Sequence, residues 1–250
     1  MNTTLKGNGH TLPGEMPDLE FWREHSTISL TPVAAPSILG LYGFAASTFM
    51  VAANMAGWYG NDSLTPLVLF PFALAFGGIA QFLSGMWAYR ARDGLATAMH
   101  GTWGAFWIGY GLYHLLIALT VLPGTSANPV AASAFGFWFV VLAAITWVGT
   151  VAASAENTAL TLVLGTLAIG ATLLAIALLA GLPSIEVIAA YLLLISAVLA
   201  FYVASAMMLE GTFKRVVLPV GTRGTPSRPG TVAHHPIQYE SGEPGVKIGQ

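Results

Sequence analysis

Long apolar segments separated by short polar turns dominate the sequence between residues 34 and 222. A helix that crosses a bilayer takes about 20 consecutive, mostly apolar residues. Six segments meet this requirement, and they cover 36–58, 65–89, 95–121, 129–152, 158–180 and 185–209. The connections between them are short and carry turn-forming residues such as Pro123-Gly124. Consecutive helices are therefore predicted to be antiparallel.

This pattern predicts an all-α polytopic membrane protein with six transmembrane helices in a bundle. A transmembrane β-barrel shows segments of about ten residues with alternating polarity, whereas the apolar runs here are continuous. We expect a cytoplasmic N-terminal tail at 1–33, a six-helix transmembrane domain at 34–222 and a flexible cytoplasmic C-terminal tail at 223–250. The last of these is rich in Gly, Pro, Thr and Ser and has little apolar surface to bury.

Composition agrees with a membrane protein. Charged residues make up 8% of the 250-residue chain, whereas soluble proteins carry about 25%. The net charge of −2 gives no reason to expect a nucleic-acid partner, and the chain has no cysteine for disulfide or thiol chemistry. We expect no cofactor and no metal site.

The basic residues predict the orientation. All nine lie before the first span, in the second loop or after the sixth span, at Lys6, Arg23, Arg90, Arg92, Lys214, Arg215, Arg223, Arg228 and Lys247. The first, third and fifth loops have none. By the positive-inside rule, both termini are predicted to be cytoplasmic, in a multi-pass protein of the plasma (inner) membrane.

Uncharged polar residues inside the spans are the candidate functional groups, because polar groups are costly in a bilayer. The main candidates are Asn54, Gln81, His100 and His114. Asn54 and Gln81 either hydrogen-bond across helices or line a path. The two histidines either sit at the membrane interface or form a polar or proton relay. A small-residue ridge through Gln81 allows another helix to approach closely, and its members are Ala73, Gly77, Gln81 and Gly85.

The third span carries an aromatic stripe at helical spacing. Its members are His100, Trp103, Trp107, Tyr110 and His114. Such a stripe indicates either packing and a headgroup belt or the wall of a narrow conduit. The sequence has no paired intramembrane carboxylates, nucleophile elbow or phosphate loop. We therefore expect passage of a small molecule and no enzyme activity.

Four stretches in order resemble the acetate uptake transporter family, the succinate–acetate permeases. They are Ala35-Pro36-Ser37-Ile38-Leu39-Gly40-Leu41 with Tyr42-Gly43-Phe44, then Phe76-Gly77-Gly78-Ile79-Ala80-Gln81, then Gly104-Ala105-Phe106-Trp107, and finally Arg215-Val216-Val217-Leu218-Pro219-Val220-Gly221. The family's first-span motif reads Asn-Pro-Ala-Pro-Leu-Gly-Leu, so this chain departs from it at Ala35 and Ile38. The resemblance covers about residues 34–222.

The resemblance implies a hexamer in which each protomer has its own path for acetate and similar monocarboxylates, in some members succinate. It assigns a hydrophobic constriction to Phe44, Trp103 and Leu167, with Trp103 where the family has Tyr. The candidate residues for the opening and wall of the path are Pro36, Leu39, Gly40, Leu41, Asn54 and Gln81. Met207 stands where bacterial relatives often carry Glu.

Three functions fit these features of the sequence. The first is channel-like or proton-coupled passage of a small organic anion or its neutral acid, by a homo-oligomer in the lipid bilayer. A narrow apolar neck favours the neutral acid, because an ion pays a large desolvation cost there. The alternatives are a facilitator for urea, ammonia or a short amide, and a membrane scaffold without transport.

Overall fold

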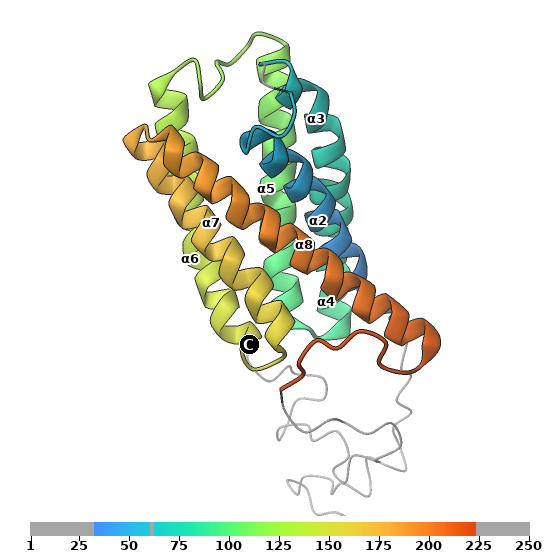
Figure 1. Cartoon of the computed structure of the whole chain (residues 1–250). Helices are drawn as coiled ribbons and strands as arrows, with labels where there is room; N and C mark the ends of the chain where they lie inside the picture. The colour runs from blue at the N-terminus through green and yellow to red at the C-terminus, as the bar shows by residue number, and fades with distance from the viewer. Residues whose placement is uncertain (1–32, 61–62, 224–250) are drawn as a thin grey trace, which may run out of the picture. The chain divides into compact units, whose positions relative to one another are not determined.

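The computed structural model describes residues 33–60 and 63–223 (Figure 1). The two predicted tails lie outside them apart from Val33 and Arg223, as does the histidine pair His234-His235. The helical unit begins at Ala35.

The described residues form helices and no strand. In chain order these are α2 (Ser37–Met55), α3 (Thr65–Ala73), η1 (Leu74–Ala80), α4 (Gln81–Ala91), α5 (Gly94–Ala118), α6 (Pro129–Ala153), α7 (Thr158–Ala180) and α8 (Pro183–Phe213). Because α3, η1 and α4 form one continuous helix over Thr65–Ala91, there are six long helices. The predicted all-α class is confirmed, and each helix lies within a few residues of its predicted segment.

Five of the six long helices are long and apolar enough to cross a membrane, and α5 is the exception. At 25 residues α5 has the length to span. It is less apolar because histidine, tryptophan, tyrosine and glycine occupy much of it. Nine of its residues are nevertheless buried, including Trp103 and Trp107. The polar and aromatic side chains of α5, such as His100 and Trp103, therefore face the inside of the bundle.

The six long helices lie side by side in one bundle (Figure 1), and their contacts close a ring. Helix α2 packs against α8, α8 against α7, and α7 against α6. Helix α5 connects α6 to the α3–η1–α4 helix, which returns to α2. Large apolar side chains such as Phe137 and Val148 cover the outside of the ring. Such a surface suits lipid, since soluble monomers rarely expose large apolar patches.

A π-helix interrupts the second long helix at η1. Pro71 lies three residues before it and lacks the amide hydrogen that a regular helix uses. The amide of Gly77, inside η1, donates to Ser47 Oγ at 2.8 Å. π-Helical turns often mark functional sites, and this one directly precedes Gln81.

The segment after α8 returns across the start of α7, and we call residues 214–223 the strap. The amides of Thr158 and Ala159 donate to the carbonyls of Gly221 and Val220, and the amide of Arg223 donates to the carbonyl of Glu156 at 2.8 Å. Asn157 caps α7 by accepting from the amide of Leu160. These bonds hold the α6–α7 turn in place.

Candidate functional site

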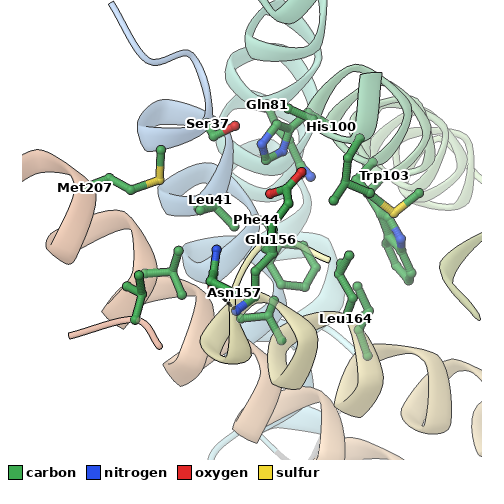
Figure 2. Close-up of a pocket in the computed structure, with 18 residues that line it drawn as sticks. Ser37, Leu41, Phe44, Gln81, His100, Trp103, Glu156, Asn157, Leu164 and Met207 are labelled. Carbon is green, nitrogen blue, oxygen red and sulfur yellow. Dashed lines mark hydrogen bonds between the residues drawn. The ribbon is translucent and has the colours of Figure 1, made fainter. Parts of the chain in front are cut away.

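Two cavities enter the helix ring from opposite ends of α2. The N-side cavity, near the N-terminus of α2, has a volume of about 170 Å³. Its wall includes α2, α5, α7 and the ends of α8 and the strap. Its lining includes Ser37, Leu41, Phe44, Gln81, His100, Trp103, Glu156, Asn157, Leu164 and Met207 (Figure 2). Leu167 lines it as well.

The C-side cavity, near the C-terminus of α2, is larger, at about 440 Å³. Aromatic side chains of α5 form much of its wall, at Trp103, Phe106, Trp107, Tyr110, Tyr113 and His114. Thr48 and Asn54 of α2 and Glu186 of α8 also line it. The stripe predicted on α5 thus lies along the walls of the two cavities, and its Trp103, Trp107 and Tyr110 also belong to the packed apolar core.

Trp103 lines both cavities and so separates them. Its indole Nε1 donates to Thr146 Oγ1 at 3.0 Å, which fixes the ring. Phe44 meets Trp103 edge-on, with ring centroids 6.0 Å apart. Leu167, from α7, is 1% exposed and also lines the N-side cavity. The three residues assigned to the constriction therefore come from three helices, and all three line the N-side cavity.

Polar side chains gather in the N-side cavity, where Ser37, Gln81, His100 and Glu156 face one space (Figure 2). Gln81 and His100 are 2% and 5% exposed. The imidazole lies directly on the backbone of α2, because a Cβ built on Gly40 would be 2.6 Å from its Cε1 and Nδ1 atoms. Glycine at this position therefore leaves the space that the imidazole of His100 occupies.

Glu156 lies at the mouth of the N-side cavity, in the turn between α6 and α7. Partial burial raises the pKa of its carboxyl, and the negative charge of Asp93 raises that pKa further. The carboxyl is therefore neutral over a wider pH range than a free glutamate. Among the described residues, no lysine or arginine lines either cavity, so none of them offers an anion a direct counter-charge there.

Three buried polar atoms lack a hydrogen-bond partner within the described part of the chain: Thr48 Oγ1, Gln81 Oε1 and Trp107 Nε1. Gln81 lies in the N-side cavity, and Thr48 and Trp107 lie in the C-side cavity. The three atoms thus lie on both sides of Trp103. Because buried polar groups are normally paired, these atoms are available to a guest molecule or to water.

The remaining predicted site residues are more scattered. Pro36 immediately precedes α2 at the N-cap position, and its carbonyl accepts from Ser84 Oγ at 2.6 Å. Leu39 is 50% exposed and lines neither cavity, whereas Leu41 is buried and lines the N-side cavity. Asn54 lines the C-side cavity, but its amide nitrogen donates to the carbonyls of Tyr59 and Gly60.

His114 belongs to the C-side cavity, so the structure places it apart from His100. Its Nδ1 lies 2.9 Å from the carbonyl oxygen of Tyr110, and its ring packs on the Tyr110 ring in a tilted arrangement, with a centroid distance of 4.0 Å. Trp103 lies between the two histidines along α5. His100 therefore lines the N-side cavity, and His114 lines the C-side cavity.

Comparison with known protein families shows which family the chain belongs to. The sequence matches the GPR1/FUN34/yaaH family over residues 20–222, the greater part of the chain. The chain belongs to the GPR1/FUN34/yaaH family. This confirms the resemblance drawn from the four sequence stretches.

Individual family members are similar over most of the helical region. The succinate-acetate/proton symporter SatP of Escherichia coli (strain K12) is 27% identical over 196 residues, which is 76% of this chain and 97% of that protein. Acetate permease A of Emericella nidulans is 27% identical over 109 residues, or 41% of this chain and 36% of that protein. A solved structure described as the bacterial acetate channel SatP superposes with a TM-score of 0.69 at 26% identity, covering 76% of this chain and all of that one.

Sequence reasoning missed several residues of the two cavities in this family member. Glu156 and Asn157 lie in a short polar turn, and Val220 lies in the strap, so their contact with the N-side cavity depends on tertiary packing. Thr48 looks like an ordinary threonine in an apolar helix. Its position one turn after Phe44, on the same helix face, is the signal that could have found it.

Proposed function

We propose that this protein carries acetate or a related small monocarboxylate across the membrane, through the two cavities of each protomer. The supporting observation is that both cavities meet at a single aromatic residue, Trp103. The names of the family members support the substrate class, since SatP and acetate permease A are both described as acetate transporters.

The neutral acid is the form that we propose to pass Phe44 and Trp103. Moving an ionised carboxylate into an apolar site costs far more than moving a protonated one, and no basic side chain from residues 33–60 or 63–223 lines either cavity. Gln81 Oε1 is an unpaired acceptor beside the constriction, and it suits the O–H group of a protonated acid. Passage would then follow the proton gradient, and succinate would enter as its fully protonated form.

We further propose that the N-side cavity opens to the cytoplasm of a plasma (inner) membrane. Arg90 and Arg92 at the end of α4, and Lys214 and Arg215 after α8, lie at the N-side end of their helices. Positive charge of this kind favours the cytoplasmic side. The exposed apolar surfaces of α4 and α6 suit lipid or neighbouring protomers, as expected for a homo-oligomer such as a hexamer.

Uptake of labelled acetate into proteoliposomes tests this function. We expect uptake above that of protein-free liposomes and faster uptake at acidic than at neutral external pH, because carboxyl groups titrate near pH 4 and more neutral acid is then present. Propionate and lactate should compete, and urea should not. Absence of acetate uptake at every pH gradient, or competition by urea alone, would contradict the proposal and favour the neutral-solute or scaffold alternatives.

A further inference from the structure

We propose that Glu156 and Glu186 form a charge filter at the two ends of the path, which keeps ionised acids out of the cavities and leaves them free for the neutral acid. The inference rests on the proposed function for its substrate, and it assigns the choice of protonation state to two residues. Glu156 lines the N-side cavity, and Glu186 lines the C-side cavity. No other Asp or Glu from residues 33–60 or 63–223 lines either cavity.

Glu156 is held at the mouth of the N-side cavity by its backbone. It lies in the turn between α6 and α7, where its carbonyl accepts from the amide of Arg223 at 2.8 Å. Its side chain faces the same space as Gln81 and His100 (Figure 2). A small molecule that enters from this end therefore passes the carboxylate before it reaches the polar groups inside.

The charges around Glu156 favour repulsion of an anion. Partial burial raises the pKa of its carboxyl, and the charge of Asp93 raises that pKa further. The guanidinium of Arg223 lies on the same turn, but it donates to the carbonyl of Ser154 at 3.1 Å and to Thr158 Oγ1 at 3.3 Å. Arg223 does not line the cavity. An anion inside the cavity is therefore exposed to the carboxylate and not to this cation.

Glu186 has the matching position at the C-side cavity. It lies in the first turn of α8 and is half-buried. Residues of the loops also line this cavity, namely Ser63, Gly124, Thr125, Ser126 and Ala127. Glu186 therefore lies at the end of the cavity that the loops surround. The amides at a helix N-terminus favour the charged form of a carboxylate, so this position suits an ionised glutamate.

Repulsion by these carboxylates distinguishes the two forms of an acid. Two like charges about 4 Å apart in water repel strongly enough to change an equilibrium about fivefold. The N-side cavity is small, at about 170 Å³, so an anion inside it lies close to Glu156. The neutral acid carries no charge and is not repelled. The filter thus lowers occupancy of the cavities by the anion alone.

This exclusion matters because the ionised form is in large excess at neutral pH. Carboxyl groups titrate near pH 4, so the neutral acid is then the rare species. The apolar rings of Phe44 and Trp103 oppose the crossing of an anion, but they do not prevent it from occupying a cavity. The two glutamates therefore keep anions from obstructing the path of the neutral acid.

A permanent anion tests the filter. Methanesulfonate is similar in size to acetate but stays ionised, so it reports entry of an anion without passage of a neutral acid. The measurement is inhibition of labelled acetate uptake into proteoliposomes at about pH 7, where glutamate is ionised. We expect the double variant Glu156→Gln, Glu186→Gln to need about fivefold less methanesulfonate for half-maximal inhibition than the unaltered protein. Because both mouths are changed, this result does not depend on the orientation of the protein in the liposome.

Two controls separate the charge at the mouths from other effects. The double variant Glu156→Asp, Glu186→Asp keeps both charges and should be inhibited like the unaltered protein. Glu210 is exposed and lines neither cavity, so Glu210→Gln should also leave the half-maximal concentration unchanged. Equal half-maximal concentrations in the double Gln variant and the unaltered protein, with acetate uptake intact, would overturn the filter and leave the proposed function standing.

Thermal unfolding of the purified proteins distinguishes failure of the filter from failure of the proposed function. A ligand that binds the native state stabilises it, so methanesulfonate should raise the midpoint of the double Gln variant at about fivefold lower concentration than in the unaltered protein or in Glu210→Gln. If liposomes take up no acetate but this difference is present, the proposed function fails and the filter stands. If there is no uptake and no difference, both proposals fail.

Discussion

Phe44→Ala is expected to speed acetate passage about fivefold and to admit longer monocarboxylates such as butyrate, if about 1 kcal/mol of the barrier lies at this ring. Phe44 is 3% exposed and lies between the N-side cavity and Trp103, against which it packs edge-on. Removing the ring joins its volume to the cavity and widens the narrowest part of the proposed path. The measurement is initial uptake of labelled acetate and butyrate into proteoliposomes.

Phe49→Ala is the matched control for this variant. Phe49 lies on the same helix but is 40% exposed, and it lines neither cavity. Its replacement should leave the rate and the acetate-to-butyrate ratio unchanged. Equal selectivity in Phe44→Ala and the unaltered protein would show that Phe44 does not limit the size of the substrate.

The second large effect is expected at Gly104, where α5 crosses α4. A Cβ built on Gly104 would lie 2.6 Å from the amide nitrogen of Phe82 and 2.7 Å from its Cα. These are backbone atoms, so a methyl group must push the two helices apart. Gly104→Ala should therefore destabilise the protein by about 1–3 kcal/mol. It should also disturb Trp103, the adjacent residue.

Gly109→Ala on the same helix should have the opposite sign. Gly109 is exposed, and nothing lies within 4 Å of a Cβ built there. Alanine is favoured over glycine in a helix by about 0.5–1 kcal/mol, so this variant should be slightly more stable. Thermal unfolding of both variants in detergent tests the pair. Equal midpoints for the two variants would contradict the close packing of α5 on α4.

The helices could be predicted because their signal is local. Continuous apolar runs locate the spans, and capping residues such as Asp93, Asn128 and Asn157 mark where α5, α6 and α7 begin. The π-helix could not be predicted from the apolar pattern, since Leu74–Ala80 is apolar on every face. It depends on Pro71 and on the hydroxyl of Ser47, which comes from another helix.

Only some of the residues that line the two cavities could be predicted from the sequence. The aromatic stripe of α5 and Gln81 stood out because polar and aromatic groups interrupt apolar helices, and both line cavities in the structure. Leu39 shared the same motif but faces outward, because the helix period places it on the opposite side from Leu41. The unpaired state of Thr48 and Trp107 depends on which neighbours fail to reach them, and no sequence pattern carries that information.

Chemical block of a single introduced cysteine tests the proposed path most directly, because the chain has no cysteine of its own. Ser37 lines the N-side cavity, whereas Ser154 is exposed and lines neither cavity. Each is changed separately to cysteine, labelled with a bulky thiol reagent to completion as judged by mass, and assayed for acetate uptake. We predict that labelled Ser37→Cys loses acetate uptake while labelled Ser154→Cys keeps it. Full uptake by completely labelled Ser37→Cys would show that acetate does not pass through the N-side cavity.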